Sequence, residues 1–221
     1  MPIDPDAAIE VTALGWVPEG ARGHVRDLRV RWALEEAGLP YRTRLLSGAI
    51  GEERPAEYYR EQPWGQVPVY REGDVQMFEC GAIALHIAER SEVLLPRDDV
   101  GRARAITWLF AALNTMDVAI MGYLMAAVFN ADKPWSADAG ETFGTFLTQR
   151  LARLGDWLGD SEWLEGRFTV GDLMMVATLR GEEILDRAPR NVVDYVARGE
   201  ARPAFQRALA AQLADFTPEP A

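Results

Sequence analysis

Two short motifs in the first half of the chain combine residue types that could hold a small peptide. The first is Val67-Pro68, at the beginning of a predicted strand. Proline lacks the amide hydrogen that a sheet ladder uses, so it is tolerated where a strand begins or at a sheet edge. If the Val67–Pro68 bond is cis, Val67 presents its backbone N–H and C=O outward, where an extended peptide can pair with them. The alternative is a trans proline that only begins an edge strand.

The second motif is Glu79-Cys80-Gly81, at the predicted start of a helix. Backbone N–H groups at a helix N-terminus attract an anion, and a neighbouring carboxylate attracts a cation. A free α-amino acid end carries both charges on one carbon, and this motif suits it. The alternative is that Glu79 only caps the helix and complements its dipole. Together, the two motifs predict a site for a short peptide with a free amino acid end.

The hydrophobic pattern predicts the elements that position these motifs. Strands are expected at residues 9–14, 41–46, 67–71 and 75–78, and helices at residues 24–38, 55–62 and 80–90. The order βαβαββα implies one sheet, with a parallel pair, a right-handed crossover and a closing antiparallel hairpin. This α/β order is the thioredoxin-like pattern, although other α+β folds share it.

The second half of the chain reads almost wholly helical. Helices are expected at residues 102–129, 137–158, 168–185, 191–199 and 202–216. Thr169-x-x-Asp172 is a capping-box variant, so we assign both residues to folding. Pro203 suits the first turn of the last helix. The apolar stretch at 111–129 contains Asn114 and Asp117, and we interpret it as a buried helix and not as a membrane span.

The composition excludes several classes of partner. The formal net charge of −11 disfavours binding to a nucleic acid backbone. A single cysteine excludes an intrachain disulfide and fits a reducing compartment. The N-terminal residues show no basic region followed by an apolar run, so no secretory signal is visible. We therefore expect a cytoplasmic protein without a metal site.

Four segments resemble the glutathione transferase family, in its cytosolic, bacterial-type form. Residues 65–90, "GQVPVYREGDVQMFECGAIALHIAER", look like its glutathione-site segment, and "RVRWALEEAGLPY" is similar to its first helix and following strand. "FTVGDLMM" and "ARPAFQRAL" resemble its C-terminal motifs. The resemblance covers nearly the whole chain in the same order. It implies a thioredoxin-like domain at 1–96, a helical-bundle domain at 97–221, glutathione as co-substrate, and a homodimer.

The resemblance also implies roles for individual residues. Val67 would pair with the cysteinyl backbone of glutathione, and Pro68 would be a cis-proline. Glu79 and Cys80 would hold the γ-glutamyl head group, and Gln66 is a weaker candidate for a backbone contact. Cys80 departs from the family's usual serine, and a thiol is a weaker hydrogen-bond donor than a hydroxyl.

The group that would activate the glutathione thiol is the main departure from the family. Members usually supply a Tyr or Ser hydroxyl, or a Cys, after the first strand, but residues 15–27 contain no Tyr, Ser, Thr or Cys. His24 could take the thiol proton. Arg22 or Arg26 could lower the pKa of the thiol by their charge. The N-terminus of the following helix could help through its backbone N–H groups.

In this fold the electrophile would bind between the domains. The residues expected there are Trp16, Trp108, Met116, Tyr123 and Leu124, for which core packing is the alternative. The predicted function is conjugation or reduction of a hydrophobic electrophile with glutathione, as in detoxification. One alternative is a non-catalytic protein that binds glutathione or hydrophobic ligands. The other is a glutathione-dependent disulfide oxidoreductase, in which only Cys80 could take part.

Overall fold

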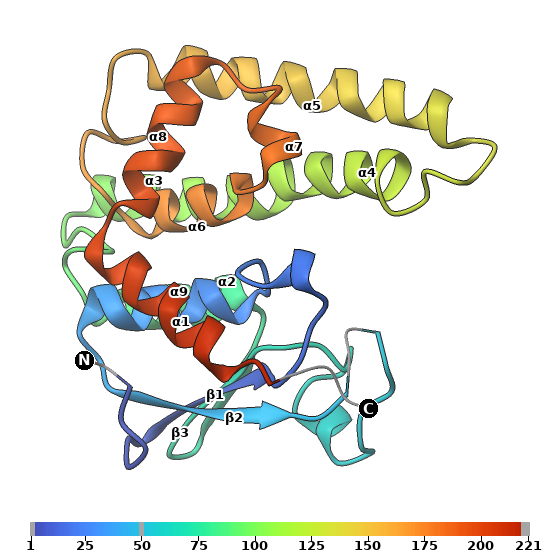
Figure 1. The fold of residues 1–221 in the computed structure, drawn as a ribbon. Coiled ribbons are helices and arrows are strands. Elements are labelled where there is room, and N and C mark those ends of the chain that lie inside the picture. The colour runs from blue at the N-terminus through green and yellow to red at the C-terminus, as the bar shows by residue number, and fades with distance from the viewer. Residues whose placement is uncertain (1–2, 49–50, 218–221) are drawn as a thin grey trace. The chain divides into compact units, whose positions relative to one another are not determined.

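The computed structural model describes residues 3–48 and 51–217, and its contacts divide the chain into two compact units. The first unit runs to Leu94 and also includes the segment from Arg202 onward, and the second unit is Leu95–Ala201. Figure 1 shows the elements of both units. The sequence-based division at residue 96 therefore needs one change, because the last helix belongs to the first unit.

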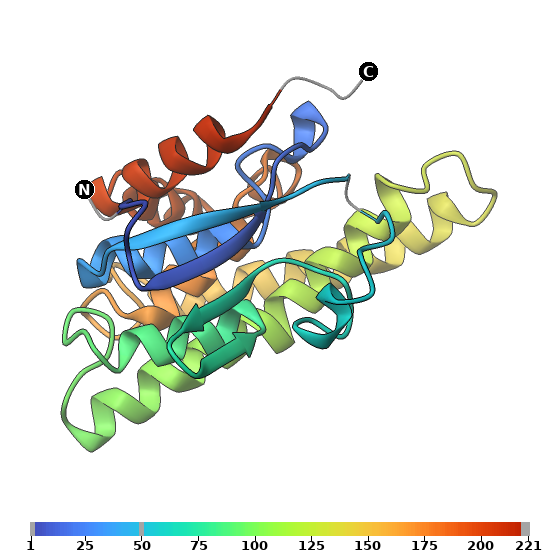
Figure 2. The same ribbon diagram turned by 90° about the horizontal axis from the view of Figure 1, so that it is seen from below.

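The first unit contains a four-stranded sheet in the order β2-β1-β3-β4. Its strands are β1 (Ile9–Leu14), β2 (Tyr41–Leu46), β3 (Val69–Glu72) and β4 (Val75–Phe78). β1 and β2 pair in parallel and β3 and β4 pair antiparallel, both as predicted. β3 also pairs antiparallel with β1. Figure 2 shows β1 and β2 side by side from below. Gly73 has a φ of 57°, which the tight β3–β4 turn uses.

Helices α1 (Asp27–Ala37) and α2 (Cys80–Ala88) complete the thioredoxin-like pattern. Three elements differ most from the prediction. α1 begins three residues later than expected, at Asp27, and residues 55–62 form only a 3-10 turn at Tyr58–Arg60. Pro63 disfavours helical backbone in the residue before it, which limits that short segment. β3 begins at Val69, which pairs with Phe78 of β4, and not at Val67.

The β1–β2 pair carries an ion-pair cluster that makes the stability of the fold depend on pH. Glu10 Oε1 accepts a hydrogen bond from Arg44 Nε at 2.8 Å, and Arg42 donates to the other carboxylate oxygen. Burial acts to raise the pKa of Glu10, but hydrogen bonds and charge from Arg44 and Arg42 outweigh it and lower the pKa. The folded state therefore holds this carboxylate in its ionised form more firmly than the unfolded chain does.

We expect Glu10→Gln to reduce the free energy of unfolding by about 1 kcal/mol at neutral pH, because both arginines are partly exposed. Since the folded pKa lies below the unfolded value of 4.5, the contribution is complete above that value. It is lost as the pH falls through the folded pKa. Urea titrations of both proteins across acidic pH should show their stabilities converging. A gap that stays constant down to the lowest pH would contradict this.

The last helix, α9 (Pro203–Asp215), packs on α1 in the first unit. Arg31, which is fully buried, donates from Nε to Asp27 at 2.7 Å and from Nη2 to Asp215 at 2.6 Å. Gln212 Nε2 donates to the other oxygen of Asp27 at 2.8 Å. Burial would penalise each charge alone, and Arg31 gains its pairing with Asp215 only when α9 lies on α1. This explains why α9 groups with residues far away in the sequence.

The second unit is helical. Its elements are α3 (Asp99–Ala111), a π-helical turn (Ala112–Met116), α4 (Asp117–Ala127), α5 (Ser136–Leu158), α6 (Val170–Leu179), α7 (Glu182–Leu185) and α8 (Arg190–Glu200). The predicted helix at 102–129 is thus one run, Asp99–Ala127, interrupted by the π turn. By length and composition that run could cross a membrane, a test that core helices of other proteins also pass. Here it packs against α5 and α6.

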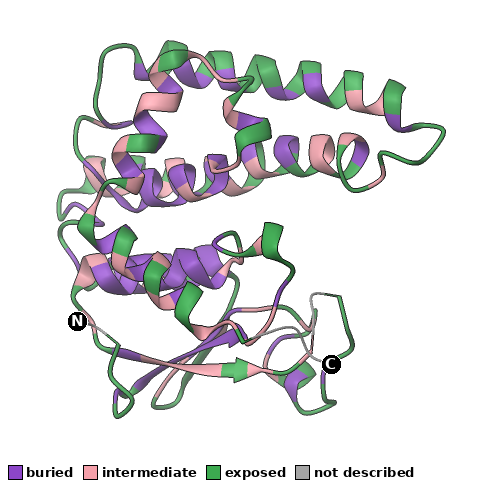
Figure 3. Cartoon of the chain, viewed as in Figure 1, coloured by how far each residue is buried: buried purple, intermediate pink, exposed green. Residues whose placement is uncertain are grey.

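Two further predictions about the helical unit are confirmed. α5 buries one side at helical spacing, including Leu147, Leu151 and Leu154, and Figure 3 shows buried and exposed positions alternating along it. Thr169 caps α6, and Asp172 completes the capping box by accepting from the Thr169 N–H at 2.9 Å. Outside this unit, Pro203 occupies the first turn of α9, as expected.

Candidate functional site

The first unit contains a cavity of about 470 Å³ beside the end of β1. It lies among the β1–α1 connection, the segment after β2 and the residues before β3. Its lining residues are Leu14, His24, Val25, Arg26, Gly51, Glu52, Glu53, Arg54, Tyr59, Trp64, Gly65, Gln66 and Val67. Among the residues that the structure describes, no group of three or more His, Cys, Asp and Glu is arranged to hold a metal ion.

The cavity brings together predicted residues from two separate segments. His24 and Arg26 come from the β1–α1 connection, and Gln66 and Val67 come from the residues before β3. Arg22 does not line the cavity, and its guanidinium carbon lies 5.8 Å from the ring centre of Phe216. Trp16 is half-buried and is not among the lining residues.

The Val67–Pro68 bond is cis, as the peptide-pairing interpretation required. Neither the N–H nor the C=O of Val67 forms a hydrogen bond with any residue from 3 to 48 or 51 to 217. Both groups therefore remain available at the wall of the cavity. The Gln66 carbonyl is already used, because Tyr58 Oη donates to it at 2.6 Å. Burial raises the pKa of Tyr58, which keeps this hydroxyl protonated and able to donate.

Glu79 holds an unusual backbone conformation at the start of α2. Its φ is 70°. Within the part of the chain that the structure describes, it is the only residue other than glycine with a positive φ. Its side chain is exposed and makes no capping hydrogen bond, so the capping alternative is not observed. A strained, exposed carboxylate beside a helix N-terminus is typical of ligand sites. Glu79 does not line the cavity described above.

Cys80 is buried, with 3% of its surface exposed, and it also does not line the cavity. Its sulfur lies 3.8 Å from Arg29 Nη1, within the interior of the first unit. The expected side-chain contact with a head group is therefore not supported by the position of the thiol. The backbone N–H of Cys80 lies in the first turn of α2, where helix N–H groups have no partner within the helix.

The C-terminal segment fixes both ends of the connection that carries His24 and Arg26. Thr217 donates from its backbone N to Gly15 O at 2.8 Å. At the other end, Gln212 Nε2 donates to Val25 O at 3.2 Å as well as to Asp27. These contacts were not predicted, because no local pattern links residues about two hundred positions apart. The cavity therefore depends on α9 for the shape of one wall.

Among the cavity residues that sequence reasoning missed are Arg54, Tyr59 and Trp64. Arg54 Nη1 donates to Ser47 O at 2.7 Å and its Nε donates to Gly65 O, so it ties the wall together. Tyr59 Oη accepts from the backbone N of Arg54 at 3.2 Å. Trp64 is 69% exposed at the cavity mouth. Of these residues, Trp64 could have been suspected from the sequence, because it comes just before the Val67-Pro68 motif.

Of the five residues expected to bind an electrophile, Trp16 belongs to the first unit and the other four belong to the second. Tyr123 lines a separate cavity within the helical unit, whereas Met116 is buried with 4% exposure. Trp108 donates from Nε1 to Glu165 at 2.7 Å, which is a structural contact. Leu124 is half-buried and is not among the residues that line the Tyr123 cavity. The core-packing alternative therefore accounts for Met116, whereas Trp108 is half-buried.

A thioredoxin-like unit with a cis-proline, joined to a helical unit, defines the class of fold. Residues 20–89 match the family model described as "Glutathione S-transferase, N-terminal domain". A glutathione transferase family member from Pseudomonas fluorescens, solved with two glutathione bound, superposes with a TM-score of 0.78 at 24% identity, over 91% of this chain and 92% of that one. The recognition made from sequence is confirmed. Residues 20–89 belong to the N-terminal domain family of the glutathione S-transferases, and the chain has their fold.

Two curated relatives that are also named glutathione S-transferases match this chain over different lengths. "Glutathione S-transferase 4" of Zea mays is 40% identical over 62 residues, and the match spans 28% of either chain. "Glutathione S-transferase" of Hyoscyamus muticus is 25% identical over 199 residues, covering 82% of this chain and 92% of that protein. The stronger identity therefore lies in a short segment, and the longer match extends through the helical unit.

Proposed function

We propose that this protein binds glutathione in the cavity of the first unit and joins it to a hydrophobic electrophile. The observation that carries this is the unpaired backbone of Val67 at the cavity wall, next to the cis bond to Pro68. A peptide of three residues can pair with that edge as a short strand. The glutathione-bound relative from Pseudomonas fluorescens and the names of the curated relatives support the same ligand.

Each part of glutathione has a proposed partner in the first unit. The cysteinyl backbone pairs with the N–H and C=O of Val67. The γ-glutamyl ammonium is held by the Glu79 carboxylate, and its carboxylate by the N–H groups that begin α2 at Cys80. Gln66 contributes a backbone N–H, since its carbonyl is occupied.

The cationic and basic groups at the cavity supply the proposed thiol activation. Glutathione reacts as its thiolate, so a group that takes the proton or stabilises the negative charge is needed. His24 is exposed at the cavity and takes the proton. Arg26, at the same wall, lowers the thiol pKa by its charge. Arg22 is not assigned a role in activation, because it lies against Phe216.

Calorimetric titration with glutathione and with cysteinylglycine tests the proposed head-group site. We expect cysteinylglycine to bind at least about tenfold more weakly, because it lacks the γ-glutamyl group that charge-assisted hydrogen bonds would hold. Glu79→Gln should weaken glutathione by a similar factor and leave cysteinylglycine unchanged. Asp74→Asn, an exposed residue in the β3–β4 turn, removes the same charge nearby and serves as the control. Equal affinity for both peptides would refute the proposed head-group site.

Turnover separates the transferase from the second proposal, a non-catalytic glutathione-binding protein. The observation favouring that second function is the absence of any hydroxyl or thiol side chain in residues 15–27. Conjugation of an aromatic halide and reduction of an organic hydroperoxide should both be assayed, together with the pKa of the bound thiol. A bound thiol with the pKa of free glutathione would establish the non-catalytic protein. A disulfide oxidoreductase is disfavoured because Cys80, the single cysteine, is buried. If thiol–disulfide activity survives in Cys80→Ser, the cysteine has no catalytic part in that activity.

We propose a cytoplasmic homodimer that acts in detoxification. Support for a protein partner comes from α4, where Val118, Met121 and Met125 are 62%, 37% and 47% exposed on one helical face. Such a contiguous exposed apolar face is typical of an interface. Light scattering should give twice the mass of the chain, and Val118→Glu should give a monomer. A monomeric native protein would contradict the dimer.

A further inference from the structure

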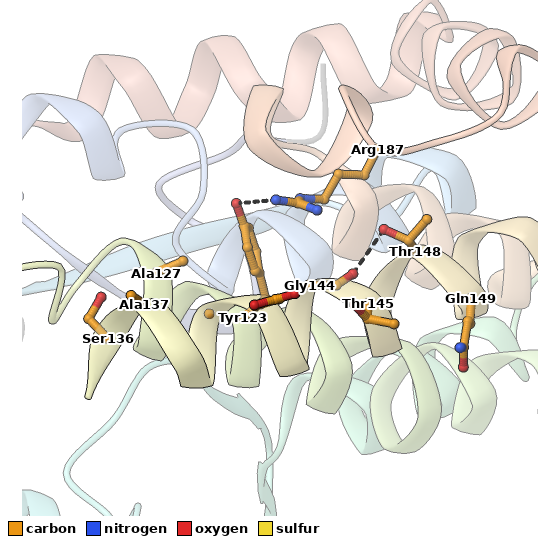
Figure 4. Close-up of a pocket in the computed structure, with 11 residues that line it drawn as sticks. Tyr123, Ala127, Ser136, Ala137, Gly144, Thr145, Thr148, Gln149 and Arg187 are labelled. Carbon is orange, nitrogen blue, oxygen red and sulfur yellow. Dashed lines mark hydrogen bonds between the residues drawn. The ribbon is translucent and has the colours of Figure 1, made fainter. Parts of the chain in front are cut away.

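The helical unit contains a second cavity, of about 560 Å³, which none of the roles proposed above uses. It lies between α4 and α5 and is closed on one side by Arg187, just after α7 (Figure 4). The volume is in the range of small-molecule sites, which is about 300–1,000 Å³. Every residue that lines it belongs to the second unit. The cavity can therefore be considered within that unit alone.

Arg187 is held in a defined position by Tyr123. Its Nη2 donates to Tyr123 Oη at 3.0 Å, and its guanidinium carbon lies 4.3 Å from the centre of the Tyr123 ring. Figure 4 shows the guanidinium reaching the end of the tyrosine side chain at the cavity. A guanidinium has five N–H donors, and this contact occupies only one side of it. The flat cation is thus fixed by stacking while several donors remain unused.

Glycine at position 144 provides the space for this arrangement. A Cβ built on Gly144 would lie 3.2 Å from Arg187 Nη1 and 3.5 Å from the Tyr123 ring. One turn earlier on α5, Gly140 faces Ala127 of α4, where an added Cβ would lie 3.2 Å from the alanine Cβ. The space above the two glycines is thus filled by Ala127 and by Arg187, so the glycines let these side chains approach α5 closely. Ala127 and Ala137 supply apolar surface in a lining that also contains polar residues.

No carboxylate neutralises Arg187 among the residues that the structure describes. The Arg187 guanidinium makes a hydrogen bond to Tyr123 and lies over its ring, and it forms no ion pair with the described residues. Glu141 also lines the cavity but forms no ion pair with Arg187. Arg187 is exposed, so its unused donors are accessible to a ligand. Arginine recognises carboxylates through paired, parallel hydrogen bonds.

We propose that this cavity binds a small aromatic carboxylate, with the carboxylate on Arg187 and the ring against Ala127 and Ala137. Three features support it together: a cavity of suitable volume, a positioned guanidinium with unused donors, and apolar alanine side chains in the lining. The site is independent of the glutathione proposal, because it uses no residue of the first unit. It fits a ligand, an inhibitor or an electrophile that carries a carboxylate.

The test uses three probes of equal shape: 2-naphthoate, 2-naphthylmethanol and 2-naphthylmethylammonium, titrated into the full chain by calorimetry. The carboxylate should bind at least about tenfold more tightly than the neutral alcohol, which is the effect of one charge-assisted hydrogen-bonded pair. Arg187→Met should remove that preference and leave the alcohol unchanged. Tyr123→Phe keeps the ring but not the hydroxyl that orients Arg187, so it should lose part of the preference.

Arg190→Met is the matched control, because Arg190 is an exposed arginine of α8 that pairs with Asp194 and does not line the cavity. It removes the same unit of charge and should leave all three affinities unchanged. Saturation with glutathione should not displace naphthoate from the native protein. The proposal is wrong if Arg187→Met and Arg190→Met weaken naphthoate equally, if the ammonium probe binds as tightly as the carboxylate, or if glutathione competes with naphthoate.

Discussion

Replacing Asp172 with alanine should lower the free energy of unfolding by about 4 kcal/mol, an effect of the size seen when a buried hydrogen-bond network is broken. Asp172 is fully buried. Its Oδ1 accepts from Leu164 N at 2.9 Å and from Tyr195 Oη at 3.1 Å, and its Oδ2 accepts from Thr169 N at 2.9 Å. Alanine would leave these buried donors without a partner. It would also remove the capping box of α6.

Burial raises the pKa of Asp172 and opposes its ionised form, while the hydrogen bonds from Leu164 and Thr169 favour it. The network therefore offsets much of the cost of burying the carboxylate. Asp172→Asn keeps the shape and one acceptor oxygen, so it should cost about half as much as alanine. Chemical denaturation followed by tryptophan fluorescence and far-ultraviolet circular dichroism measures both values. A loss below about 1 kcal/mol in Asp172→Ala would show that the network is not stabilising.

Replacing His24 with alanine should lower kcat/KM for conjugation by about 100-fold, the usual range for loss of a general base. The affinity for glutathione should change little, because the peptide backbone is held at Val67 and the head group at Glu79. The thiol of bound glutathione should titrate closer to its free value in the variant. Ultraviolet absorbance of the bound thiolate as a function of pH measures that shift directly.

Tyr59→Phe tests whether a tyrosine hydroxyl, and not His24, activates the thiol. Tyr59 is the residue in the cavity lining that carries a phenol, and its oxygen accepts a hydrogen bond from the Arg54 backbone. It therefore offers a second source of a hydroxyl near the ligand. We expect Tyr59→Phe to retain most of the activity. If Tyr59→Phe loses activity and His24→Ala does not, the thiol is activated by the tyrosine and our assignment to His24 is wrong.

The strands, the parallel β1–β2 pair and the Glu79-Cys80 helix start could be predicted because their signals are local. Alternation of apolar residues, a turn glycine and a helix stop each occupy a few neighbouring positions. The capping box at Thr169 belongs to the same group, whereas the cis state of Pro68 was implied only by the family resemblance. The family resemblance joined these local signals into one fold, and the match over residues 20–89 agrees with it.

What could not be predicted depends on contacts between distant residues. The return of α9 to the first unit rests on the buried cluster of Arg31, Asp27 and Asp215, and the sequence shows these only as separate charges. The position of Arg54 in the cavity wall depends on two backbone carbonyls, which no side-chain pattern reveals. Cys80 was expected beside the head group of the ligand, but its side chain is buried near Arg29.

The return of α9 has a consequence for how the protein is made. The first unit uses both ends of the chain, since Gln212 and Thr217 fix the connection that carries His24. On the ribosome, residues 9–88 emerge first, yet the helix that completes their packing follows only after the whole helical unit. The helical unit, encoded as one continuous segment, can fold before its neighbour is finished. The cavity of the first unit is therefore completed only once residues 203–217 have been translated.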